Sequence, residues 1–152
     1  MLNGDFLDFV QLLNTHDVAY MVVGGYALAF HGKPRFTGDL DIWIEVSTDN
    51  ARKMTQVLHD FGMGSLGLTE DDFLSPGIIT QIGHPPLRID ILNEIDGVAF
   101  SEARPNAMTV AIGDASVRVI GLSEFIRNKK ASGRAQDLVD VAHLTKSGAD
   151  QP

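Results

Sequence analysis

The sequence predicts a single α/β domain, of the α+β kind, in which helices flank a mixed central β-sheet and two further helices close the C-terminal end. Segments with helical spacing of apolar residues are interspersed with short segments that have the pattern of strands. Several of these strands follow one another in pairs, which favours a mixed sheet over a regular doubly wound one. The 152 residues contain no repeat and no interdomain linker, so we expect one domain over residues 1–146 and a polar tail over 147–152.

The first half of the chain is expected to alternate helices with strands. Apolar residues at helical spacing predict a helix over about 5–15, and a short, partly β-branched apolar run predicts a buried strand over 19–23. Two glycines end this strand and lead into a short helix over 26–31. Alternating apolar residues predict the next strand over 40–44, and a helix capped by a Thr-Asp pair is expected over 48–61.

The second half contains two expected pairs of strands. Residues 62–77 are rich in glycine and acidic residues and are expected to be mostly loop. Strands over 78–82 and 87–92 follow, and a tight Gly-His-Pro-Pro turn joins them. A Gly-Asp pair joins the strands over 108–112 and 116–120 into a hairpin. These pairs would supply most of the sheet.

The C-terminal part predicts two helices with a local concentration of positive charge. Ser123 is expected to cap a helix over 124–131, and Gly133 separates it from a final helix over 134–145. The basic residues form either a solvated helix face or a local site for an anion, and the sequence leaves both open. They are Arg127, Lys129, Lys130 and Arg134.

Composition and charge exclude several classes of function. The formal net charge of −8 argues against a general nucleic-acid binder, because phosphate contacts need Lys and Arg. The chain has no cysteine, so a disulfide scaffold and a cysteine-ligated metal site are excluded. The N-terminal residues lack the basic start of a secretory signal, and no apolar run is long enough to span a membrane. We therefore expect a cytoplasmic location without a membrane partner.

Three aspartates stand out because they occupy strands that are otherwise apolar. Asp39 and Asp41 lie two residues apart at the start of one strand, so their side chains point to the same face. Asp90 lies between isoleucines in another strand, where an unpaired carboxylate is costly to bury. If the two strands are neighbours in the sheet, the three carboxylates converge, and their mutual repulsion makes a cation the natural partner.

The type of ligand decides which cation is expected. An all-oxygen site suits Mg²⁺ or Mn²⁺ rather than zinc. Two such ions bridged by carboxylates can activate a hydroxyl and stabilise a leaving phosphate. The alternative interpretation is an Asp-x-Asp sequence that merely caps a turn at the start of the strand.

The glycine pair upstream points to the same chemistry. Val23 ends an apolar strand, and Gly24 and Gly25 lead from it into a helix. Glycine lets the backbone approach a ligand closely, and the N-terminus of a helix offers free N–H groups to a phosphate. The alternative is that the two glycines simply make a tight turn.

Together these residues resemble the nucleotidyltransferase superfamily, which includes polymerase beta, the kanamycin-type nucleotidyltransferases and the minimal nucleotidyltransferases. The superfamily pattern is an apolar strand, a Gly-Gly or Gly-Ser turn, a helix, Asp-x-Asp or Asp-x-Glu on the next strand, and a third Asp on a later strand. The matching positions in this chain are Gly24, Gly25, Asp39, Asp41 and Asp90.

Two longer segments resemble a small bacterial subgroup related to the AbiEii-type toxin nucleotidyltransferases. The first is the run Gly-Gly-Tyr-Ala-Leu-Ala-Phe-His-Gly over 24–32, followed by Arg35 and Thr37. The second is Lys-Lys-Ala-Ser-Gly-Arg-Ala-Gln-Asp-Leu-Val-Asp over 129–140. The resemblance extends from about residue 22 to residue 144 and implies the nucleotidyltransferase fold.

The resemblance also implies roles for the acidic and glycine residues. Asp39 and Asp41 would bind both metal ions. Asp90 would bind the catalytic ion and help to activate the acceptor hydroxyl. Gly24 and Gly25 would hold the triphosphate of the nucleotide.

Further nucleotide contacts are implied for basic residues. Lys129 and Arg134 would face the phosphates, and Asp137 would orient one of them by an ion pair, since it lies three residues after Arg134 on the same helix face. Arg35 and Thr37 would either position the strand that follows them or touch the nucleotide.

The expected function is therefore the Mg²⁺-dependent transfer of a nucleoside monophosphate from an NTP to a hydroxyl group, with release of pyrophosphate. The acceptor would be RNA, a protein or a small molecule, and a toxin–antitoxin system is one expected setting. The acidic composition makes a large RNA the less expected acceptor. The alternative function is that of a non-catalytic member of the same fold, which binds a nucleotide or a partner protein.

Overall fold

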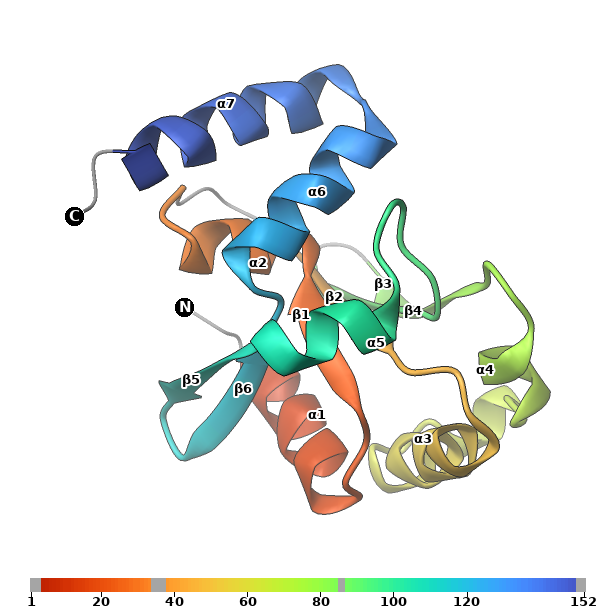
Figure 1. Ribbon diagram of the computed structural model, residues 1–152. Helices are drawn as coiled ribbons and strands as arrows, with labels where there is room; N and C mark the ends of the chain where they lie inside the picture. Colours follow the sequence, from red (N-terminus) through yellow and green to blue (C-terminus); the bar gives the residue numbers. More distant parts are fainter. Residues whose placement is uncertain (1–3, 34–37, 85–86, 150–152) are drawn as a thin grey trace.

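The computed structural model of the protein describes residues 4–33, 38–84 and 87–149 (Figure 1). The helices are α1 (Gly4–Thr15), α2 (Gly24–Phe30), α3 (Thr48–Asp60), α4 (Asp71–Leu74), α5 (Phe100–Ala103), α6 (Leu122–Ser132) and α7 (Ala135–Ala149), with short 3-10 turns at Gly64–Leu66 and Arg104–Asn106. The strands are β1 (Tyr20–Val23), β2 (Asp39–Ile44), β3 (Ile79–His84), β4 (Leu87–Leu92), β5 (Met108–Ile112) and β6 (Ala115–Val119). Across the described ranges, none of the helices has the length and apolar character needed to cross a bilayer.

The six strands form one mixed sheet in the order β3-β4-β2-β1-β6-β5. Strands β2 and β4 run parallel, as do β1 and β6, and the other neighbouring pairs are antiparallel. The mixed sheet flanked by helices confirms the predicted fold class. Because β2 lies between β1 and β4, it brings residues from three separate parts of the chain together at the middle of the sheet.

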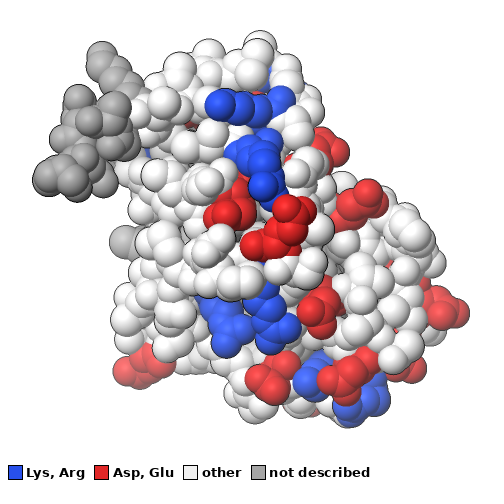
Figure 2. Space-filling model, viewed as in Figure 1, with Lys and Arg blue, Asp and Glu red and all other residues white. Residues whose placement is uncertain are grey.

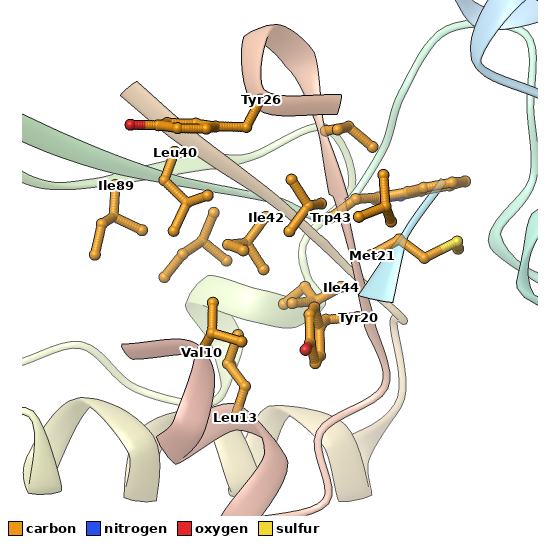
Figure 3. Close-up of a cluster of buried hydrophobic side chains, with 14 of the residues drawn as sticks. Val10, Leu13, Tyr20, Met21, Tyr26, Leu40, Ile42, Trp43, Ile44 and Ile89 are labelled. Carbon is orange, nitrogen blue, oxygen red and sulfur yellow. The ribbon is translucent and has the colours of Figure 1, made fainter. Parts of the chain in front are cut away.

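The core lies between the sheet and the helices α1 and α3, which sit side by side below the sheet in Figure 1. Figure 3 shows Val10 and Leu13 of α1 reaching towards Tyr20 and Ile44 on the strands. All four side chains are buried. Alternation along β2 sends its aliphatic residues to this face and leaves the other face for its aspartates.

Trp43 shares the aspartate face of β2 but belongs to the core. Its side chain is fully buried and packs edge-to-face against Phe100 of α5, with ring centroids 5.0 Å apart. The short helix α5 was not expected from the sequence, because four residues are too few to show a periodicity. It covers Trp43 on the aspartate face of β2.

Several helix boundaries differ from the sequence-based prediction. Helix α2 begins at Gly24 and not at residue 26, so the glycine pair forms its first turn. Ser47, rather than the Thr-Asp pair after it, caps α3 by accepting a hydrogen bond from the backbone N–H of Asn50. Ser123 lies inside α6, which begins after Gly121 without a side-chain cap.

The C-terminal helix is longer than expected. Gly133 ends α6, as predicted, and it adopts the left-handed conformation with φ of 67°. Helix α7 then continues to Ala149, three residues into the segment expected to be a tail. Helices α6 and α7 pack against each other at the end of the molecule opposite α1 and α3 (Figure 1).

Candidate active site

The predicted aspartates come together because β2 and β4 are parallel neighbours. In their register Asp41 lies opposite Asp90, and Asp39 lies opposite Arg88. Residues two apart on a strand share a face, so all four side chains lie on the same side of the sheet. The structure therefore places Asp39, Asp41 and Asp90 in one cluster, as the sequence led us to expect.

Arg88 is the residue of this cluster that the sequence analysis missed. Its Nε donates to Asp90 Oδ1 at 2.8 Å, and its Nη2 donates to Asp39 Oδ2 at 3.0 Å and to Asp90 Oδ2 at 3.2 Å. The guanidinium thus bridges two carboxylates from two strands. The Arg-x-Asp spacing on one strand was the available signal, because it predicts that both side chains share a face.

Asp41, the third carboxylate of the cluster, has a raised pKa. Burial raises the pKa of Asp41 to about 7, and the negative charges of Asp90 and Asp39 and a hydrogen bond with Asp90 act in the same direction. The positive charge of Arg88 opposes these effects only in part. The cluster therefore holds more negative charge than Arg88 neutralises.

Gly24 provides the space that Asp41 occupies. Strand β1 pairs with β2 so that Val23 lies opposite Asp41, which brings the first residue of α2 against the carboxylate. A Cβ atom on Gly24 would collide with Oδ2 of Asp41, and its φ of 67° also disfavours any side chain. Glycine is needed here for close approach to the acidic cluster, which is more specific than a turn alone.

These residues fit a divalent cation by the chemistry of their donors. Three carboxylates supply oxygen ligands only, and oxygen ligands suit Mg²⁺ and Mn²⁺. In the described parts of the chain, no three His, Cys, Asp or Glu side chains are already arranged around a position for an ion. Within this cluster, N–H groups of Arg88 donate to oxygens of Asp39 and Asp90.

A cleft of about 410 Å³ connects the acidic cluster with the C-terminal helices. Gly24 and Asp41 lie on one side of it, and Lys129, Arg134 and Asp137 lie on the other. The remaining wall is partly apolar and partly acidic, formed by Val23, Ile79, Leu92, Glu94, Ile95, Asp96, Phe125, Asn128 and Ser132. A larger hollow of about 630 Å³ lies between α1 and the β5–β6 hairpin, and none of the predicted site residues lines it.

The basic side of the cleft is built from a network of ion pairs between α6 and α7. Lys129 is only 7% exposed, and its Nζ lies 3.1 Å from Asp137 Oδ1 and 3.0 Å from Asp140 Oδ2. Arg134 donates from Nε to Asp137 Oδ2 at 2.7 Å. The sequence predicted that Asp137 pairs with one of these two basic residues, and in the structure it pairs with both.

The two basic residues differ in what they offer a ligand. Lys129 is buried, so the interpretation of the basic run as a solvated face is wrong for this residue. Arg134 keeps 79% of its side chain exposed although its Nε is tied to Asp137. Burial alone would raise the pKa of Asp137, but hydrogen bonds from Arg134, Ser132 and Lys129 hold it at about 2. Asp137 is therefore ionised at neutral pH and fixes both cations.

Two further members of the network were not predicted as site residues. Asp140 is fully buried and accepts from Lys129 and from Lys33, whose Nζ lies 2.6 Å from Oδ1. Lys33 follows α2, so this pair ties the end of that helix to α7. The three-residue spacing of Asp137 and Asp140 could have revealed their common helix face. Arg35 and Thr37 lie outside the described residues.

The surface around the cleft is mixed in charge. Figure 2 shows Lys and Arg side chains gathered over the region of α6 and α7, with acidic side chains beside them. His31 does not belong to this surface, because its Nε2 lies 2.7 Å from the carbonyl oxygen of Ile120 and its ring stacks on Phe125. The positive charge near the cleft is thus local, within a chain whose net charge is −8.

Comparison with known proteins gives a fold and no closer relationship. No protein-family model and no curated protein matches the sequence. A candidate nucleotidyltransferase from Thermotoga maritima has a similar structure, with a TM-score of 0.58 and 14% identity over 99% of this chain and 97% of that one. The lincosamide antibiotic adenylyltransferase LnuA, in its lincomycin-bound structure, gives a TM-score of 0.57 and 13% identity over 95% of this chain and 97% of that one. The chain therefore has the nucleotidyltransferase fold that its motifs predicted.

Proposed function

We propose that this protein transfers a nucleoside monophosphate from an NTP to a hydroxyl acceptor, with Mg²⁺ or Mn²⁺ as its cofactor. The observation that carries the proposal is the arrangement of one cleft. Asp41, a member of a three-carboxylate cluster, lies on one side, and Lys129 with Arg134 lies on the other. An NTP complexed with a divalent cation presents the complementary charges, a cation to face the carboxylates and anionic phosphate oxygens to face the basic residues.

Individual residues of the chain suit the steps of such a reaction. A bound divalent cation would supply charge neutralisation for the reacting phosphate. Arg134 has an exposed guanidinium with which to contact phosphate oxygens, and Lys129 adds a fixed positive charge behind it. Asp90 would accept the proton of the acceptor hydroxyl. Gly24 and Gly25 would let the backbone approach the triphosphate.

A small molecule is the acceptor class that we propose. LnuA is named as an adenylyltransferase of lincosamide antibiotics, and its structure and this chain cover each other almost completely. The fold can therefore serve a small acceptor without an additional domain. The net charge of −8 opposes the approach of a polyanion such as RNA. A toxin role of the AbiEii type stays a prediction from the motifs.

Calorimetric titration of each NTP in the presence of Mg²⁺ tests the nucleotide site. We expect binding to the wild type and a loss of at least about tenfold in affinity for Asp41→Asn, which removes one charge without changing shape. Asp114→Asn, in the distant β5–β6 hairpin, is the matched control and should bind like the wild type. Absence of NTP binding to the wild type would overturn the proposal.

The acceptor class is tested with NTP that carries a label on the α-phosphate. Three acceptor pools are supplied in parallel: small hydroxyl compounds, total RNA and a protein extract. The proposal expects labelled small molecules and free pyrophosphate. Label on RNA or protein would overturn the proposal of a small-molecule acceptor. NTP binding without any transfer would favour the non-catalytic alternative.

A further inference from the structure

Arg88 occupies the position at which a cation would be expected in the acidic cluster. It is the partner that two of the three carboxylates have in common, and its contacts use three of their four oxygens. The pairing crosses two strands, since Arg88 and Asp90 are on β4 and Asp39 is on β2. Such charge-assisted, two-pronged pairs are the strong form of a hydrogen bond.

The charges explain why the arginine is needed when no metal is bound. When all three carboxylates at the middle of the sheet are ionised they repel one another, and burial in a medium of low polarity strengthens this repulsion. Arg88 removes one of the three negative charges and is itself always protonated.

Arginine and metal cannot use these oxygens together. A cation held by Asp39 and Asp90 would share both carboxylates with the guanidinium, and two positive charges on the same carboxylates repel each other. The N–H groups of Arg88 also point at the lone pairs that the metal would use. Entry of a metal ion therefore requires the guanidinium to move away from at least one of the two carboxylates.

We propose that Arg88 is a positioning residue that acts as a built-in counterion: it holds the metal-free carboxylates together, and a divalent ion must displace it in order to bind. This inference rests on the proposed function, because it assumes that the cluster is a metal site. It adds that a residue of the chain itself limits the affinity of the site for a divalent ion. The arginine stabilises the empty site and at the same time weakens the affinity of the site for a free metal ion.

Binding of Mn²⁺ alone, followed by the loss of the free-ion signal in electron paramagnetic resonance, tests the proposal without any need for activity. We expect Arg88→Gln to bind Mn²⁺ about tenfold more tightly than the wild type, or more, because no charge-assisted hydrogen bonds must be broken. The same variant should unfold at a lower temperature than the wild type in the presence of a chelator and recover with Mn²⁺. Unchanged or weaker Mn²⁺ binding would overturn the proposal, because Arg88 would then merely support the ligands.

Two further variants secure the interpretation. Arg88→Lys keeps the charge but cannot span both carboxylates, so its Mn²⁺ affinity should lie between those of the wild type and Arg88→Gln, and it serves if the glutamine variant does not fold. Arg104→Gln is the matched control, because Arg104 is exposed and pairs with Glu45 at 3.4 Å outside the cluster. If Arg104→Gln raised the Mn²⁺ affinity by the same factor, the effect would come from net charge alone, and the proposal would be overturned.

The outcomes separate this inference from the proposed function. If Asp41→Asn abolishes Mn²⁺ binding in both the wild-type and the Arg88→Gln background, the signal comes from the carboxylate cluster. If the wild type binds Mn²⁺ through Asp41 and Arg88→Gln binds no more tightly, only the counterion role fails. If neither protein binds Mn²⁺, the metal-dependent function and the counterion role fail together.

Discussion

Asp41 illustrates how a single residue can be costly for the fold that contains it. Its pKa rises to about 7, first because the group is buried and then because Asp90 and Asp39 are negative. The folded protein therefore keeps a proton that the unfolded chain releases at a lower pH. Between about pH 4 and pH 7 the folded state binds more protons, so stability falls as the pH rises through this range.

Replacing Asp41 with Asn should remove this loss. In the presence of a chelator we expect the variant to gain about 2 kcal/mol over the wild type at pH 8, after allowance for the partial exposure of the group, and much less at pH 4. Urea unfolding at the two pH values measures the difference. A gain that is equal at both pH values would contradict the raised pKa. Asp39→Asn should not reproduce the gain, because Asp39 pairs with Arg88.

Gly24 has no space for a side chain, which gives a second prediction for a single residue. Alanine at this position meets the Asp41 carboxylate and a left-handed backbone at once. Gly113→Ala is a matched comparison, because its φ of 59° is similar and nothing lies within 4 Å of the added Cβ. We expect Gly24→Ala to cost about 1–2 kcal/mol more than Gly113→Ala in thermal unfolding. Equal losses would show that the carboxylate moves aside freely.

At the scale of elements, the joint between α6 and α7 is held by buried charge. Asp140 is completely buried between Lys129 and Lys33, so it links both C-terminal helices with the end of α2. A buried pair of this kind does not prove a large net stabilisation, since both charges lose their hydration. Removal of one partner is nevertheless costly, because the other is left buried and uncompensated.

Asp140→Asn should therefore destabilise the protein by about 3 kcal/mol in urea unfolding. Asp60→Asn is the control, because Asp60 pairs with His16 on the surface, and its loss should cost much less than that of Asp140. Hydrogen exchange locates the effect, and it should appear first in the amides of α7. Faster exchange throughout the sheet, with α7 unchanged, would show that Asp140 does not stabilise the joint between α6 and α7.

At the scale of the whole molecule, charge governs which partners can approach. Among the residues that the structure describes, the basic ones near the cleft are few, and most of them are held by carboxylates. We expect no retention of total RNA in a filter-binding assay at about 150 mM salt, since phosphate contacts need free Lys and Arg. RNA binding that weakens steeply with salt would show a basic surface that the net charge of −8 conceals.

The arrangement of the whole molecule also explains which parts of the candidate site could be predicted from the sequence. The convergence of Asp39, Asp41 and Asp90 was predictable, because alternation fixes the face and only the pairing of two strands had to be assumed. The bridge made by Arg88 depends on the register of β2 against β4, which no local pattern specifies. The burial of Lys129 depends on α7 folding back onto α6, so the basic run alone could not distinguish a buried ion pair from a solvated face.

The parallel pairing of β2 with β4 also has a consequence for the order of folding events. Asp39 and Arg88 are 49 residues apart in the chain, so the carboxylates meet only when a long loop closes. The like charges then converge in the step that docks β4 against β2. Refolding of the metal-free protein should be slower at pH 8 than at pH 5.5, and millimolar Mg²⁺ should accelerate it if the cluster is already formed in the transition state.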